Sequence, residues 1–396
     1  MGTSFGRSFH YLQENVDYIP FQMPKHSRFP PYAVPLSEEE EARASRYLSE
    51  EWIVSMREHG FIVPENPEDI LPYCRQLHTV YNYEGIRRSG LNVIFDNFME
   101  AISLTHSKQG QKWDDAIANL GIRLCDLAHQ EGFSLIRNRR DLDRLDIAGN
   151  EIGIVASMET STPIENELDR IDMLYGFGIR CMGITYNDAN LLGSGLSEAS
   201  DGGLTAFGRR AVRRMNKLGI VVDISHCGQR TGLDVVFESE YPILMTHSGA
   251  RNVWDSPRMA TDELLKACAA KGGVIGVCAA PNTTLSGDGK EHSIEDVMAH
   301  FAYIVDLVGI DHVGIGSDTF YGDHLALQSA FDTRLMLSES HGSVPEHATT
   351  HVRGAENPNE ATSNIVRWLI RNGYTDAEMK KVLSENVLRV LRQVLR

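Results

Sequence analysis

Two histidines follow apolar segments of the kind that form buried β-strands. Residues 220–225 lead into His226 and residues 242–246 lead into His247, with a helical pattern over residues 228–238 between them. Parallel strands joined by a crossover helix run in the same direction, so both histidines should emerge on one face. Imidazole is a common ligand of catalytic divalent metals. The pair therefore predicts a metal site, whereas either histidine alone would be equally consistent with a side chain that caps its strand.

Two carboxylates follow apolar segments in the same way. Glu159 lies just past residues 152–157, and Asp318 lies just past residues 312–315. A carboxylate can bind one metal or bridge two, which makes Glu159 the natural third ligand. Asp318 is placed to hold an attacking water or to pass a proton to a leaving amine, although an Asp at this point is also a common cap of the following segment. The convergence of all four side chains on one face favours metal-assisted catalysis.

Eight short apolar segments alternate with helical patterns along the chain. This alternation is typical of the α/β class and predicts a (β/α)8 TIM barrel of the metal-dependent hydrolase type, with an N-terminal arm and extra helices. We expect an arm and helix packed on the barrel over residues 1–60, and the barrel with C-terminal helices over residues 61–396. The helix should cover residues 37–59. The strands are expected at residues 61–63, 91–95, 152–157, 180–185, 220–225, 242–246, 273–278 and 312–315.

Composition narrows the class of protein. The chain has 396 residues with 42% hydrophobic content, ample for one large core, and neither a signal peptide nor an apolar run of the ~18–20 residues that span a bilayer is expected. A net charge of −16 without a basic cluster argues against nucleic acid as a partner. Six scattered cysteines without a CxxC pair favour reduced thiols and a cytoplasmic location. The proline-rich arm is of the sort that wraps a neighbour, so we predict a homo-oligomer.

Three motifs around these residues carry a family resemblance. The sequence DISHCG around His226, the sequence THSGARNV around His247 with PR after it, and GIDHVGIGSD ending at Asp318 resemble the renal (membrane) dipeptidase family, peptidase family M19, within the amidohydrolase superfamily. The segments ENP at 356–358 and LSENVLRVL near the C-terminus extend the resemblance over roughly residues 91–396.

The resemblance implies a zinc dipeptidase, in which a carboxylate-bridged pair of metals activates water to attack a peptide bond. Glu159 matches the bridging carboxylate, and His226 and His247 match the two histidines of the second metal. Arg258 matches the arginine that holds the substrate carboxylate, a task that suits the bidentate fork of a guanidinium. Asp318 matches the aspartate near the bridging water that also meets the substrate amine. A dipeptide or a similar small amide is therefore the expected substrate.

The sequence departs from this family at the first strand. That strand normally ends in His-x-Asp or His-x-His, which supply the first metal's private ligands, whereas here the expected positions hold Pro64 and Asn66. Proline has no donor atom, and an amide oxygen is a weak ligand for zinc. Glu65 should point to the opposite face by strand alternation, which leaves Glu68 or Asp69 in the following loop as replacements. Zinc is the expected cofactor, with one ion favoured over two.

A second departure concerns the substrate. Tyr186 follows the fourth expected strand, where the family commonly has a histidine that contacts the substrate or its oxyanion. A phenol can donate a hydrogen bond to a developing oxyanion, so the role is either kept or changed with a different substrate. Asn187, next to it, is equally suited to line the pocket and to cap the loop.

Three interpretations remain open from these residues. The first is a hydrolase with one metal held by Glu159, His226 and His247 and with Asp318 as base; the second keeps two metals with an unusual first site. The third is an altered or inactive barrel that binds a small carboxylated ligand, since a fold does not fix a function. Deamination or decarboxylation of a small carboxylated molecule on a single metal is a further alternative.

Overall fold

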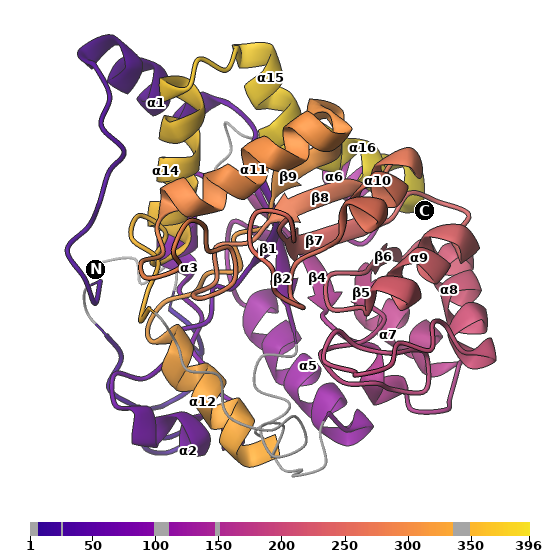
Figure 1. Cartoon of the computed structure of the whole chain (residues 1–396). Helices are drawn as coiled ribbons and strands as arrows, with labels where there is room; N and C mark the ends of the chain where they lie inside the picture. The colour runs from indigo at the N-terminus through magenta and orange to yellow at the C-terminus, as the bar shows by residue number, and fades with distance from the viewer. Residues whose placement is uncertain (1–6, 25–26, 99–110, 147–150, 336–348) are drawn as a thin grey trace.

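The computed structural model describes residues 7–24, 27–98, 111–146, 151–335 and 349–396. At its centre eight parallel strands form a closed barrel, surrounded by helices (Figure 1). Around the ring the order is β1, β2, β4, β5, β6, β7, β8 and β9, and β9 pairs with β1; β3 lies outside the ring beside β4. The predicted (β/α)8 barrel is thus confirmed. The strands are β1 (Val54–Glu58), β2 (Val93–Asn97), β3 (Phe133–Leu135), β4 (Ile152–Met158), β5 (Cys181–Gly183), β6 (Val221–Asp223), β7 (Leu244–Ser248), β8 (Val274–Val277) and β9 (Val313–Ile315).

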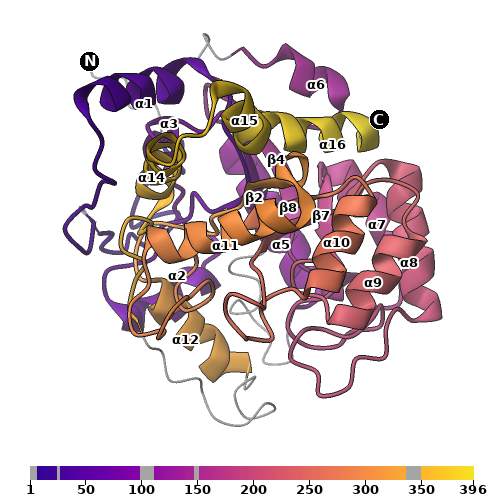
Figure 2. The same ribbon diagram turned by 45° about the horizontal axis from the view of Figure 1, so that its top comes forward.

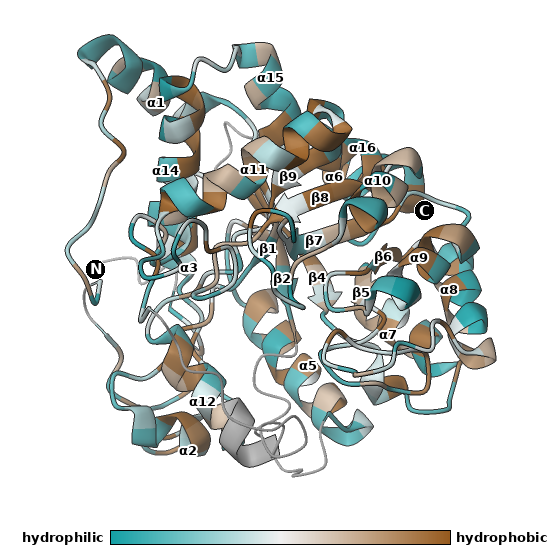
Figure 3. Ribbon diagram, viewed as in Figure 1, coloured by the Kyte–Doolittle hydropathy of each residue, from teal (hydrophilic) through white to brown (hydrophobic). Residues whose placement is uncertain are grey.

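The helices turn apolar sides toward the strands and polar sides outward (Figure 3). They are α1 (Glu38–Glu50), α2 (Ile70–Arg75), α3 (Tyr83–Arg87), α5 (Trp113–Ala128), α6 (Arg139–Arg144), α7 (Arg170–Phe177), α8 (Ala206–Leu218), α9 (Gln229–Glu238), α10 (Asp262–Ala270), α11 (Ile294–Val308), α12 (His324–Leu335), α14 (Pro358–Arg371), α15 (Asp376–Lys380) and α16 (Asn386–Val394). Short helical turns are η1 (Pro67–Asp69), η2 (Thr162–Ile164), η3 (Ile310–His312) and η4 (Lys381–Glu385).

The amino end of the barrel is filled by apolar side chains. Residues near the strand starts form one buried cluster with helix α16, including Val54, Val221, Leu244 and Val274 from the strands. Figure 2 shows α15 and α16, in yellow, lying across this side of the barrel. Because the amino end is closed by packing, polar chemistry is left to the opposite, carboxyl end of the strands.

Local sequence signals fix the helix that precedes the strand of the first histidine. Helix α8 begins after Thr205, whose hydroxyl accepts a hydrogen bond from the Gly208 amide, and it ends at Gly219, which takes φ 85°. A positive φ costs glycine little, so the chain can turn there directly into β6. The strand predicted over residues 220–225 is confirmed, although it is shorter and covers Val221–Asp223.

The first barrel strand lies earlier in the chain than the sequence pattern predicts. The helix expected over residues 37–59 ends at Glu50, and β1 follows at Val54–Glu58. Two charged residues, Arg57 and Glu58, end this stretch and give it a polar appearance, yet all five residues of β1 are buried. Burial inside the barrel overrides the local pattern, because these charges find partners there.

Residues 61–63, which were expected to form that strand, make isolated bridges instead. Phe61 pairs with Tyr81 and Ile62 pairs with Tyr321. Three apolar residues in a row are too short a signal to distinguish a barrel strand from a buried loop segment.

Two strands carry an irregular register near their carboxyl ends. The pairing of β1 with β2 shifts between Ser55 and Glu58, and the pairing of β7 with β8 shifts between Met245 and Ser248. An extra residue in one strand reverses the alternation of side chains beyond it. Arg57 lies within the first shift and His247 within the second, and the two side chains contact each other inside the barrel.

The segment before α1 lies along the barrel and its helices. The Phe9 amide donates to Asp126 at 2.7 Å, and the Val34 amide donates to Asn364 at 2.7 Å. None of the helices in the described ranges is long and apolar enough to cross a membrane. No disulfide joins the six cysteines, which all lie in the described ranges, and five of them are buried.

Candidate metal centre and its surroundings

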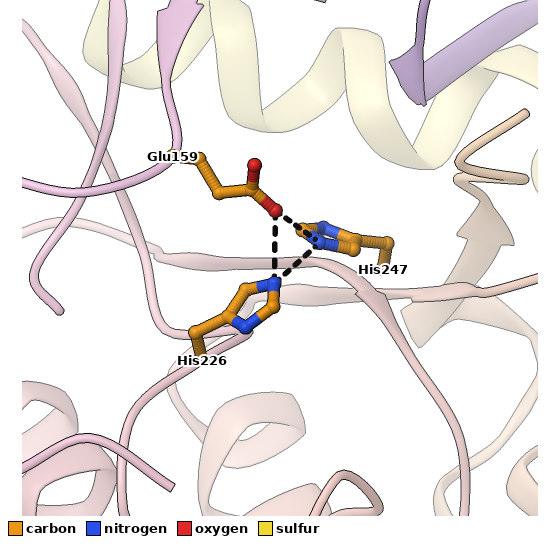
Figure 4. Close-up of side chains that lie close together, drawn as sticks. All are labelled: Glu159, His226 and His247. Atoms are coloured by element: carbon orange, nitrogen blue, oxygen red, sulfur yellow. Dashed lines mark hydrogen bonds and ion pairs between the residues drawn. The ribbon is translucent and has the colours of Figure 1, made fainter. Parts of the chain in front are cut away.

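Three side chains converge at the carboxyl end of the barrel, as predicted. Glu159 follows β4, His226 follows β6 and His247 lies in β7 (Figure 4). Glu159 Oε1 lies 2.8 Å from His226 Nε2 and 2.9 Å from His247 Nε2, and the two Nε2 atoms are 2.9 Å apart. Within the described part of the chain they form a group of ligand atoms that all lie within 4.8 Å of one another. One oxygen and two imidazole nitrogens at these separations fit a single divalent metal ion.

A buried carboxylate holds the ends of β6 and β7 together. Asp223 accepts hydrogen bonds from the Ser225 hydroxyl at 2.6 Å and from the Thr246 hydroxyl at 2.6 Å. The Ser225 hydroxyl in turn accepts from the His247 amide at 3.1 Å. The two histidines are therefore carried on backbone that is fixed by hydrogen bonds one layer below the ligands.

The outer nitrogens of the two imidazoles have partners that suit metal binding. His226 Nδ1 lies 2.9 Å from Asn187 Oδ1, which can only accept, so the proton is on Nδ1 and the Nε2 lone pair is available. His247 Nδ1 lies 2.7 Å from the Thr246 hydroxyl oxygen, which already donates to Asp223 and therefore accepts here. Asn187, predicted to contact substrate, thus lies against the back of a candidate ligand.

Burial keeps these ligands in the protonation states that a metal requires. Burial lowers the pKa of His226 to about 4, and the positive charge of Arg258 acts in the same direction. Burial also lowers the pKa of His247. For Glu159, burial alone would raise the pKa, but the charge of Arg57 and, after it, the two adjoining imidazoles hold it well below the usual range. Two neutral imidazoles and one carboxylate face each other at neutral pH.

Asp318 follows β9 on the same face and adopts an unusual backbone conformation. Its φ is 59°, in the left-handed region, which for a residue other than glycine costs on the order of 1 kcal/mol and often marks a functional position. His59 Nε2 lies 2.9 Å from Asp318 Oδ1. Burial would raise the pKa of Asp318, but His247 and His59 outweigh it and hold that pKa below the ordinary aspartate value. Asp318 is therefore an ionised carboxylate with a fixed orientation.

The other two predicted substrate contacts border the centre. The Arg258 guanidinium donates to the Ser225 carbonyl at 3.1 Å and to the His247 carbonyl at 2.8 Å. The Tyr186 ring stacks on the His226 ring with centroids 4.3 Å apart. Both side chains are partly exposed and lie next to candidate ligands.

The expected first-strand positions need correction. Pro64 and Asn66 do not follow the first barrel strand, and the Asn66 side chain caps η1 by accepting from the Glu68 amide at 3.2 Å. Glu65, in turn, contacts Gln22 of the N-terminal segment. At the end of β1 the chain instead places Arg57 and His59, which sequence reasoning missed because both fell within an expected helix. The available signal was the segment from Trp52 to Met56, which is apolar except for Ser55.

Close packing behind Glu159 leads to a first prediction. A Cβ added at Gly183, the last residue of β5, would lie 1.9 Å from the Glu159 carbonyl oxygen. Gly183→Ala should therefore displace Glu159 and weaken binding of zinc by at least ~10-fold, the scale of damage to a ligand's support. Isothermal titration with zinc measures this change.

The matched control is Gly121→Ala on α5, where an added Cβ meets no atom within 4 Å. Alanine favours a helix over glycine by ~0.5–1 kcal/mol, so this variant should keep both fold and zinc affinity. Unchanged zinc affinity in folded Gly183→Ala would show that Glu159 is not a ligand.

Comparison with known proteins identifies the family to which this chain belongs. The family model described as Membrane dipeptidase (Peptidase family M19) matches residues 99–332. A Klebsiella pneumoniae protein, described as uncharacterized and encoded in the pqqA 5′ region, is 28% identical over 278 residues, which cover 68% of this chain and 92% of that protein. The dipeptidase verJ of Clonostachys rogersoniana is 27% identical over 223 residues, which cover 56% of this chain and 50% of that protein. The chain thus spans about half the length of this named dipeptidase.

Solved structures share the fold. An amidohydrolase from Pseudomonas aeruginosa superposes with a TM-score of 0.71 at 22% identity, over 89% of this chain and 99% of that one. A metallo peptidase from Rhodobacter sphaeroides, solved with a phosphinate mimic of the dipeptide L-Ala-D-Ala, gives a TM-score of 0.66 at 21% identity over 87% and 99% of the two chains. At these identities the likeness concerns the barrel and the placement of its elements.

Proposed function

Because this chain belongs to the membrane dipeptidase family, peptidase family M19, we propose that it is a metal-dependent hydrolase that cleaves a dipeptide or a similar small amide. The observation that carries the proposal is the convergence of Glu159, His226 and His247, with donor atoms 2.8–2.9 Å apart. These three residues would hold one divalent ion, for which zinc fits the mixed imidazole and carboxylate set. When bound, such an ion supplies Lewis acidity that polarises a carbonyl and makes water more acidic.

The remaining residues of the face have roles that follow from their chemistry. Asp318 is the ionised carboxylate that takes a proton from the attacking water and returns it to the leaving amine, and His59 holds it in place. Arg258 is the fork that receives the substrate carboxylate. The Tyr186 hydroxyl is the donor that meets the developing oxyanion. Asn187 fixes the ring of His226 rather than the substrate.

Removal of the metal tests the proposal. The purified chain should bind zinc and hydrolyse members of a small dipeptide panel; a chelator should abolish turnover, and added zinc should restore it. Metal content by mass spectrometry and release of free amino acids are the measurements.

Other results would favour the alternatives. Zinc binding with release of ammonia or carbon dioxide from a small amino-acid-like acid would point to deamination or decarboxylation. A chain that retains no metal and turns over nothing would be a binding protein on a dipeptidase barrel, which would refute the proposed hydrolase.

Two further properties belong to the same proposal. Six cysteines without a disulfide, one of them the exposed Cys125, support a reducing compartment such as the cytoplasm. The expected homo-oligomer is tested by sedimentation at working concentration, where a monomer would exclude it.

A further inference from the structure

A buried arginine lies next to the candidate ligands. Arg57, in β1, is 1% exposed, and its Nη2 lies 3.6 Å from the Asp223 carboxylate, itself 2% exposed. Its Nε lies 3.4 Å from His247 Nδ1, a close contact and not a hydrogen bond, because Nδ1 already donates its proton to the Thr246 hydroxyl. Its Nη1 is buried and has no hydrogen-bond partner among the described residues. The guanidinium thus lies beneath the candidate metal ligands, and its Nη1 donates no hydrogen bond to the described residues.

Negatively charged side chains around Arg57 stabilise its permanent positive charge. Burial opposes its positive charge, but Glu159, Asp223 and Asp318 outweigh that effect and raise the pKa of Arg57 above the ordinary arginine value. The same charge is the main factor that keeps Glu159 ionised. A buried charge is tolerated only when it is paired, and here three carboxylates share one guanidinium.

The register shift in β1 is what brings Arg57 to this position. Met56 points into the barrel, where it would meet a Cβ added at Gly276 or Gly314 at 2.9 Å. In a regular strand the next side chain would point outward, but the shift between Ser55 and Glu58 turns Arg57 inward as well. The Arg57 carbonyl also accepts from the Asp318 amide at 2.9 Å, so the strand end supports the catalytic face directly.

A second metal ion does not fit this end of β1. A guanidinium has no lone pair to offer a metal and repels a neighbouring dication. His59 Nε2 and Asp318 Oδ1 lie 2.9 Å apart, but among the described residues no third His, Cys, Asp or Glu side chain joins them in a group of ligand atoms within 4.8 Å of one another. The first of the paired ions that the family resemblance implies therefore lacks a set of three ligands within the described residues.

We infer that the Arg57 guanidinium is the second cation of this centre, built into the chain, so that the site takes one metal ion and excludes another. The inference rests on the proposed metal-dependent function and specifies its metal count. Arg57 acts through Glu159 and the ligands around it, so it is a positioning residue. One divalent ion and one fixed organic cation then share the carboxylates of the site.

The wild-type chain itself gives the first test. After equilibration with excess zinc and removal of free ion, native mass spectrometry should show one zinc per chain. With Co²⁺ in place of zinc, electron paramagnetic resonance should show an isolated high-spin ion rather than a magnetically coupled pair. Two ions or a coupled pair would overturn the inference while leaving the proposed hydrolase standing, whereas absence of any ion would refute both.

Substitution at Arg57 gives the second test. Arg57→His places an imidazole two residues before His59, so this variant should bind a second zinc ion, with the count rising from one to two. Arg57→Lys keeps a positive charge and should remain at one. Circular dichroism establishes that each variant is folded, and a folded Arg57→His chain that still takes one ion would contradict the assignment. One zinc per wild-type chain without dipeptide turnover would uphold Arg57 as the second cation and reject the proposed activity.

Discussion

His226→Ala should abolish retention of the metal ion and, with it, hydrolysis. The His226 imidazole supplies one of three donors, and its Nε2 lies 2.8 Å from Glu159 and 2.9 Å from His247. Loss of an outer partner of a ligand costs ~10–100-fold in metal affinity, so loss of the ligand itself should cost more than ~100-fold. Zinc content after gel filtration, measured beside dipeptide turnover, reports both effects.

Asn66→Ala is the control for this variant, because the sequence pattern had placed Asn66 at a ligand position. The structure makes it a cap of η1. Loss of such a cap costs ~0.5–2 kcal/mol of stability, without reason to change zinc content. If His226→Ala retained a full equivalent of zinc while Asn66→Ala lost it, the metal would be bound near Asn66 and not by Glu159, His226 and His247.

The strands that end in candidate ligands were predictable, because each is a continuous apolar run followed by a polar residue. The segments before Glu159, His226 and His247 are of this kind, and a parallel barrel strand is buried on both faces. The helix between the two histidines supplied the crossover that puts them on one face. The order and direction of the strands were therefore enough to predict that these three side chains lie on the same face of the barrel.

The end of β1 was not predictable by the same reasoning. Its buried Arg57 and Glu58 resemble the polar face of a helix, and their partners come from distant parts of the chain, including Asp223 and Thr319. The register shift that turns Arg57 inward leaves no periodic signal. The family match also begins at residue 99, beyond this strand. The end of β1, where the site departs most from the expected one, therefore could not be predicted from local sequence patterns.

Asp318→Asn should lower kcat by ~10²–10⁴-fold, the contribution expected of a positioned general base. The fold should survive, because asparagine tolerates the left-handed φ of 59° at least as well as aspartate does. Zinc content should also stay unchanged, since the three donor atoms of Glu159, His226 and His247 form the group without Asp318. Steady-state kinetics on the best dipeptide of the panel, with zinc content measured on the same sample, separates lost catalysis from lost metal.

Asp311→Asn is the matched control at the amino end of the same strand, where Asp311 pairs with Lys381 at the surface. An exposed ion pair contributes ~0–1 kcal/mol, so neither kcat nor zinc content should change. A drop in kcat confined to Asp318→Asn would place the proton transfer at the carboxyl end of β9. Equal kcat in the two variants would show that Asp318 is not the general base. The base would then be another group close to Asp318, and His59, whose Nε2 lies 2.9 Å from Asp318 Oδ1, would be the first residue to substitute.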